Sequence, residues 1–151
     1  MSTTRVTRRI EAAPDDVYRA LLDPAAVQRW MVPDGMTSEV HAFDATEGGA
    51  FHITLTYDDP DRAGKTEDAS DSFHGRFSKL APGRLVEQEV EFETDDPSIA
   101  GTMTLTYELV AEGGATIVVG IHENLPAGVD PAENELGWSI ALRKLAALVE
   151  P

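Results

Sequence analysis

Apolar and polar residues alternate with a period of two along most of the chain after residue 36. Because successive side chains of a strand point to opposite faces of a sheet, this alternation predicts β-strands. We expect six strands in this region, at residues 37–44, 49–57, 71–80, 84–93, 102–111 and 115–123. A looser alternation at residues 4–11 predicts one further strand near the N-terminus. Glycine and proline turns separate several of these segments, and the short links favour an antiparallel meander.

Helices are predicted in the first 30 residues and again at the C-terminal end. Pro14 suits the first turn of a short helix, and a second short helix is expected at residues 24–30. Near the end, Asp130 is a good N-cap residue and Pro131 a good first helical residue, so a long helix is expected to run to about residue 149. Its main apolar face, at 100° per residue, contains Trp138, Ala141, Leu142, Leu145, Leu148 and Val149.

The order of these elements predicts the fold class. A seven-stranded sheet must cover its apolar face, and a C-terminal helix of roughly 20 residues, about 30 Å long, is the only predicted element long enough to do so. We therefore expect residues 1–151 to form one α+β domain, in which a curved seven-stranded antiparallel sheet wraps around the long C-terminal helix. The two short helices after the first strand would close one end of the sheet.

Composition narrows the possible chemistry. The chain has no cysteine, which excludes disulfides and thiolate nucleophiles. Its net charge of −15 repels phosphate backbones, so we expect no nucleic-acid partner. The N-terminal residues do not resemble a signal peptide, and no apolar run reaches the ~18 residues of a membrane span, so a cytoplasmic protein is expected.

The histidines show no metal-binding spacing. His41, His52, His74 and His122 form neither a His-x-x-x-His nor a His-Glu-x-x-His pattern. We therefore expect each histidine to have its own local partner, and we expect no metal site. Phosphate-loop, dinucleotide-binding and nucleophile-elbow motifs are also absent from the sequence, so no cofactor is predicted.

Local signatures along nearly the whole chain carry a family resemblance. They are Ala13-Pro14-Asp15-Asp16-Val17-Tyr18, Trp30, Gly48-Gly49-Ala50-Phe51, Phe73-His74-Gly75-Arg76-Phe77, Pro82-Gly83-Arg84-Leu85-Val86-Glu87, His122-Glu123-Asn124-Leu125-Pro126, Glu133-Asn134-Glu135-Leu136-Gly137-Trp138 and Leu145-Ala146-Ala147-Leu148-Val149-Glu150. Taken in order, they resemble the START-like (SRPBCC) superfamily, and most of all the family related to the C-terminal domain of the heat-shock-protein-90 ATPase activator. The resemblance implies a helix-grip fold with a cavity between sheet and long helix. It does not fix a function, because members include lipid carriers, hormone sensors and polyketide cyclases.

Two strand registers remain open in the sequence. In the strand at 84–93, Val86 and Val90 favour a solvent-exposed Glu87, whereas the reverse register would place Glu87 in the cavity. In the strand at 115–123, the family-like register turns Val118, Gly120 and His122 inward. The apolar alternation of Ile117, Val119 and Ile121 favours the opposite face.

We predict a cavity lined mainly by aromatic and apolar residues, with a few polar groups. The predicted lining residues are Trp30, Phe51, Ile53, Tyr57, Phe73, Phe77, Glu87, Met103, Leu105, Tyr107, His122, Asn134, Trp138 and Leu142. An acidic loop at residues 58–70 is expected at its mouth. No catalytic residue is assigned.

Three functions are compatible with this pattern. Binding of a small apolar or amphipathic molecule is favoured, because the sequence has no nucleophile or cofactor motif. The first alternative is a cyclase- or hydrolase-type enzyme that uses Glu87, His122 and Tyr107 as acid–base groups. The second is a chaperone-associated interaction protein. A homodimer is a further expectation, because the strand at 115–123, or the long helix near Ile140, has a second apolar side.

Overall fold

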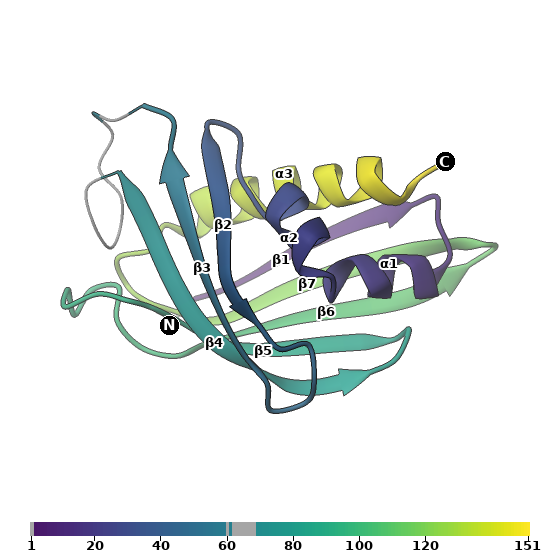
Figure 1. Cartoon of the computed structure of the whole chain (residues 1–151), viewed down its shortest axis with the longest axis horizontal. Coiled ribbons are helices and arrows are strands. Elements are labelled where there is room, and N and C mark those ends of the chain that lie inside the picture. The colour runs from purple at the N-terminus through teal and green to yellow at the C-terminus, as the bar shows by residue number, and fades with distance from the viewer. Residues whose placement is uncertain (1, 60, 62–68) are drawn as a thin grey trace.

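In the described residues, seven antiparallel strands form one curved sheet, and three helices lie on its concave side (Figure 1). The computed structural model describes residues 2–59, 61 and 69–151, so most of the expected acidic loop at 58–70 lies outside the described residues. The strands are arranged in the order β1-β7-β6-β5-β4-β3-β2. In chain order the elements are β1 (Ser2–Ile10), α1 (Pro14–Leu21), α2 (Pro24–Trp30), β2 (Met36–Phe43), β3 (Ala50–Tyr57), β4 (Ser70–Ala81), β5 (Leu85–Phe92), β6 (Met103–Glu112), β7 (Ala115–Leu125) and α3 (Pro131–Val149). The predicted helix-grip arrangement is confirmed.

The long helix α3 begins as the sequence predicts and follows β1 along its length. The Asp130 side chain accepts a hydrogen bond from the backbone N–H of Ala132 at 3.0 Å, which satisfies one of the free donors of the first turn. Near that end, the Thr4 hydroxyl of β1 donates a hydrogen bond to the Asn134 side chain. At the other end, the backbone N–H of Glu11 donates to the Glu150 carboxylate at 2.9 Å. The helix is therefore tied to β1 at both ends.

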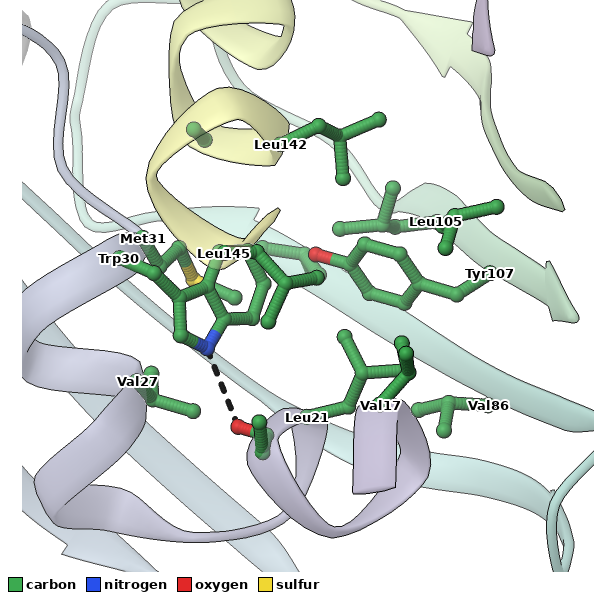
Figure 2. Packing of buried hydrophobic residues seen from close by; sticks show 14 of the residues in the cluster. Val17, Leu21, Val27, Trp30, Met31, Val86, Leu105, Tyr107, Leu142 and Leu145 are labelled. Carbon is green, nitrogen blue, oxygen red and sulfur yellow. Dashed lines mark hydrogen bonds between the residues drawn. The ribbon is translucent and has the colours of Figure 1, made fainter. Parts of the chain in front are cut away.

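The two short helices fill one end of the concave side. α1 packs against β5, β6 and β7, and α2 packs against β2 and α3. Trp30, the last residue of α2, is fully buried, and its indole N–H donates to the backbone carbonyl of Ala20 at 3.1 Å. Figure 2 shows Trp30 beside Tyr107, Leu142 and Leu145, so α2, β6 and α3 meet in one hydrophobic cluster.

The structure resolves both open registers. In β5, Val86 and Val90 are buried, and Glu87 lies on the opposite, convex face. In β7, His122 lies opposite Leu105 and Gly120 lies opposite Tyr107, so the family-like register is correct. The apolar row of Ile117, Val119 and Ile121 occupies the convex face, where Val119 is nonetheless buried.

Gly75 in β4 marks a close approach between neighbouring strands. A Cβ atom at this position would lie 2.0 Å from the backbone oxygen of Glu89 in β5 and 2.8 Å from the Phe51 ring in β3. Any larger residue would push the strands apart, so glycine is required by contact with its neighbours.

Candidate functional site

Tyr107 of β6 provides the strongest indication of a site. Its side chain points from the sheet toward α3 and Trp30 (Figure 2) and is only 1% exposed. Its hydroxyl has no hydrogen-bond partner among the described residues. Burial raises the pKa of Tyr107 well above its usual value near 10, so the group is neutral. A buried hydroxyl without a partner costs about 1–3 kcal/mol, and it leaves a donor and an acceptor free for another molecule.

An aromatic row leads from this hydroxyl toward the N-terminal half of α3. The ring centroids of Trp30 and Tyr107 are 6.0 Å apart, and those of Tyr107 and Trp138 are 5.8 Å apart. Trp138 continues to His122, at 5.4 Å. All three pairs are edge-to-face, the arrangement that aromatic rings favour. Trp138 is only partly buried, so the row reaches the surface at Trp138, whereas His122 beyond it is buried.

A polar group lies at the far end of this row, beyond Trp138. The side-chain amide of Asn134 donates to Nδ1 of His122 at 3.2 Å, and the Thr4 hydroxyl donates to the Asn134 carbonyl at 2.6 Å. His122 is 7% exposed. Desolvation lowers the pKa of His122 to about 4, although its bond to Asn134 acts in the opposite direction. The imidazole is therefore neutral at physiological pH, with its Nε2 carrying the proton.

Apolar surface remains half-open at the same end of the concave face. The short helices cover the other end, and here several inward-facing apolar side chains are only partly buried, although Met36 and Asp71 beside them are buried. These partly buried residues are Leu55, Tyr57, Phe73, Phe92 and Trp138. Partly exposed apolar side chains on a concave surface, beside a few fixed polar groups, are typical of a small-molecule site.

Gly120 leaves space beside Tyr107. The two residues are direct neighbours in the pairing of β6 with β7, on the face that is turned toward α3. A Cβ atom on Gly120 would meet no side chain within 4 Å, and its nearest neighbour would be the backbone oxygen of Val6 at 3.8 Å. The missing side chain therefore creates room in the layer between β7 and α3.

The structure brings most of the predicted lining residues to the concave side, in three groups. Trp30, Met103, Leu105, Tyr107, His122, Asn134, Trp138 and Leu142 lie around the aromatic row and its polar end. Phe51, Ile53 and Phe77 are buried in the hydrophobic core on the concave face. Tyr57 and Phe73 lie at the half-open end. Two polar neighbours were not predicted, namely Thr4 and the buried Gln88.

The inclusion of Glu87 among the lining residues was wrong. Its carboxylate lies on the convex face, where it accepts a hydrogen bond from the Ser78 hydroxyl at 2.9 Å. The register that buries Val86 turns Glu87 the other way, because successive residues alternate between faces. The acid–base group expected for an enzyme, Glu87 with His122 and Tyr107, is therefore not assembled.

The other three histidines lie on or beside the convex face. His52 is 3.0 Å from the Glu93 carboxylate, and His74 is 3.5 Å from that of Glu91. His41 is bonded to the Thr54 hydroxyl at 2.9 Å. Each thus has a polar or charged neighbour, as the sequence indicated, although Nε2 of His52 makes no hydrogen bond among the described residues. Within the residues that the structure describes, no three histidine, aspartate or glutamate side chains come together as metal ligands would.

Two surface hollows lie among the helices, away from the concave face. One, of about 290 Å³, lies between α1, α2 and Leu148 of α3, and the other, of about 480 Å³, is lined by Arg29, Lys144, Ala147 and Leu148. Both are open to solvent and have charged rims. Neither contains a residue of the aromatic row.

Replacement of Tyr107 by phenylalanine is expected to stabilise the ligand-free protein. The variant keeps the ring and its edge-to-face contacts but removes a hydroxyl that is buried without a partner. We expect the free energy of unfolding to rise by about 1–2 kcal/mol, measured by urea unfolding. Tyr18→Phe, which removes a hydroxyl from the partly buried Tyr18 of α1, is the control and should change stability little. A loss of stability in Tyr107→Phe would show that the hydroxyl has a partner after all.

The curved sheet closed over a long C-terminal helix defines the class of protein as START-like (SRPBCC), with a helix-grip fold. The sequence profile described as "Activator of Hsp90 ATPase homolog 1-like protein" matches residues 11–150. The chain belongs to this family. No curated protein gives a significant match.

Solved structures support the same assignment. A protein from Chromobacterium violaceum is 33% identical, with 99% of this chain and 97% of that chain covered and a TM-score of 0.89. An AHSA1-like protein from Aeromonas hydrophila is 19% identical, with 97% and 92% covered and a TM-score of 0.68. An Aha1 from Colwellia psychrerythraea, solved as a dimer, is 18% identical, with 99% and 97% covered and a TM-score of 0.70. The last two comparisons support the fold alone.

No helix in the described part of the chain has the length and apolar character needed to cross a membrane. The cytoplasmic location, the homodimer and the chaperone association stay predictions.

Proposed function

We propose that the concave side of the sheet binds a small apolar or amphipathic molecule against α3. The observation that carries the proposal is the Tyr107 hydroxyl, which is fully buried, neutral and without a partner among the described residues. Native proteins seldom leave such a group unsatisfied. A ligand that supplies the missing hydrogen bond would remove that cost.

The surroundings of Tyr107 support this function. Apolar side chains such as Leu55 and Phe73 are only partly buried at the open end, and Gly120 leaves room on the neighbouring strand. Because Tyr107 is 1% exposed, a ligand must displace a neighbouring side chain to reach it. Trp138 suits this role, since it is partly buried and lies between Tyr107 and the open end. We therefore expect binding to move the Trp138 ring.

A ligand screen with a blocking variant tests the proposal. Small apolar and amphipathic compounds would be screened by thermal shift on the wild type and on Gly120→Leu, whose side chain fills the space beside Tyr107. Leu136→Ala is the control, because Leu136 is 63% exposed on α3, the helix against which the ligand is proposed to bind. A ligand present at 100 times its Kd should stabilise the protein by about 2.7 kcal/mol.

The two variants should respond differently. Ligands that stabilise the wild type should stabilise Leu136→Ala equally and Gly120→Leu little. Thermal unfolding of each unliganded variant, measured alongside, would show whether Gly120→Leu is folded. Equal stabilisation of Gly120→Leu would place the ligand elsewhere and contradict the proposal.

A further inference from the structure

The described core contains no buried cation that could neutralise a bound anion. All described arginines and lysines are exposed except Lys144, which is partly buried. The Lys144 ammonium donates to the backbone carbonyl of Val32 at 2.7 Å and lies 3.2 Å from the Asp34 carboxylate. It is therefore already paired, close to the surface. A carboxylate or phosphate taken to the depth of Tyr107 would lose its hydration without gaining a counter-ion, which is strongly unfavourable.

The buried polar groups of the concave side are themselves uncharged, with one exception. Tyr107, His122, Gln88 and Thr4 are all buried on this face, and burial keeps both ionisable members of this set neutral. The exception is Asp71, which is 4% exposed and already has an interaction partner. Hydroxyl, amide and imidazole groups can recognise a ligand by hydrogen bonds but do not offer a full charge to attract one.

These two observations define a chemical class, and the inference rests on the proposed function. We propose that the ligand is uncharged, with an apolar body and one hydroxyl or carbonyl group that pairs with the Tyr107 hydroxyl. The apolar body would lie along the half-open surface near Phe73 and Phe92, whose rings meet edge-to-face at 6.5 Å. The polar group would point inward, between Trp30 and Trp138. Fatty-acid-like anions, which would bury a carboxylate at this depth, are then poor ligands.

Three compounds that share one ring system test this class. Naphthalene has no polar group, 2-naphthol adds a neutral hydroxyl, and 2-naphthoate adds an anion of similar size. Dissociation constants would be measured at neutral pH, by NMR titration, for the wild type, Tyr107→Phe and the control Tyr18→Phe. We expect wild type to bind 2-naphthol at least roughly tenfold more tightly than 2-naphthoate, because no buried cation compensates the lost hydration of the carboxylate.

The Tyr107→Phe variant tests the assigned hydrogen bond. It should weaken 2-naphthol binding by roughly five- to tenfold, the effect of one lost hydrogen bond, and leave naphthalene binding unchanged. Tyr18→Phe should alter neither. An equal loss for naphthalene and 2-naphthol would show that Tyr107 acts only through its ring, and would overturn the assignment.

Failure of this inference differs from failure of the proposed function. If 2-naphthoate binds as tightly as 2-naphthol, and Gly120→Leu blocks both, the site exists but is not selective for neutral ligands, and the inference is wrong. If none of the three compounds binds, or if Gly120→Leu binds them all as wild type does, the proposed function is contradicted as well.

Discussion

Replacement of Trp30 by alanine is expected to lower the free energy of unfolding by about 3–5 kcal/mol, the usual cost of removing a large aromatic side chain from a core. Trp30 is fully buried and joins α2, β6 and α3. Its truncation would also leave the carbonyl of Ala20 without its indole donor and remove an edge-to-face contact with Tyr107. Because domains are commonly stable by only 5–15 kcal/mol, the loss is a large part of the total.

Thermal and urea unfolding measure this effect. For a chain of this size, the loss corresponds to a fall in Tm of roughly 6–20 °C. The variant Trp30→Phe keeps a ring but loses the indole N–H. Its free energy of unfolding should lie between those of wild type and Trp30→Ala. Leu136→Ala, on the exposed side of α3, should stay within about 0.5 kcal/mol of wild type. A cost below about 1 kcal/mol for Trp30→Ala would show that α2 does not hold the helices to the sheet.

Acid is expected to destabilise the wild type by way of His122. Its pKa is lowered from 6.5 to about 4 in the folded protein, so the unfolded chain binds a proton at a higher pH than the folded chain does. The contribution of the neutral imidazole is therefore fully present above pH 6.5 and is lost as the pH falls toward 4. This difference in pKa corresponds to about 3 kcal/mol.

The variant His122→Gln isolates this effect, because glutamine does not titrate. Chemical unfolding of both proteins between pH 7 and pH 4 should show the wild type losing about 3 kcal/mol more than the variant. The pKa of Asp34 is lowered by hydrogen bonds from Lys144 and Arg143. Because Asp34 is present in both proteins, its contribution to the pH dependence of stability cancels in the comparison. Parallel pH profiles would contradict the buried, neutral state of His122.

Local signals were enough to predict the elements and the fold. The N-cap and proline at Asp130 and Pro131 mark the start of α3 without reference to the rest of the molecule. Strict alternation likewise located β3 and β6. Because only one predicted helix could cover a seven-stranded sheet, the layering followed from the order of elements.

Strand faces and long-range contacts were harder to predict. In β5, alternation from Val86 and Val90 favoured an exposed Glu87, but the same register buries polar Gln88 between them, so the reverse register could not be excluded from the sequence. The bond between Thr4 and Asn134 joins residues 130 positions apart. The unsatisfied state of the Tyr107 hydroxyl depends on every group that surrounds it in space, and no spacing in the sequence encodes that.

The most direct test of the binding site follows the two indole N–H signals of the protein, because its two tryptophans lie on either side of Tyr107. A ¹H–¹⁵N NMR titration with 2-naphthol would record both indoles together with all backbone amides. We expect the Trp138 indole to shift most, accompanied by Trp30 and by the amides around Gly120 and His122. Unchanged indoles, with shifts confined to the surface hollow at Arg29 and Leu148, would contradict a site between the sheet and α3.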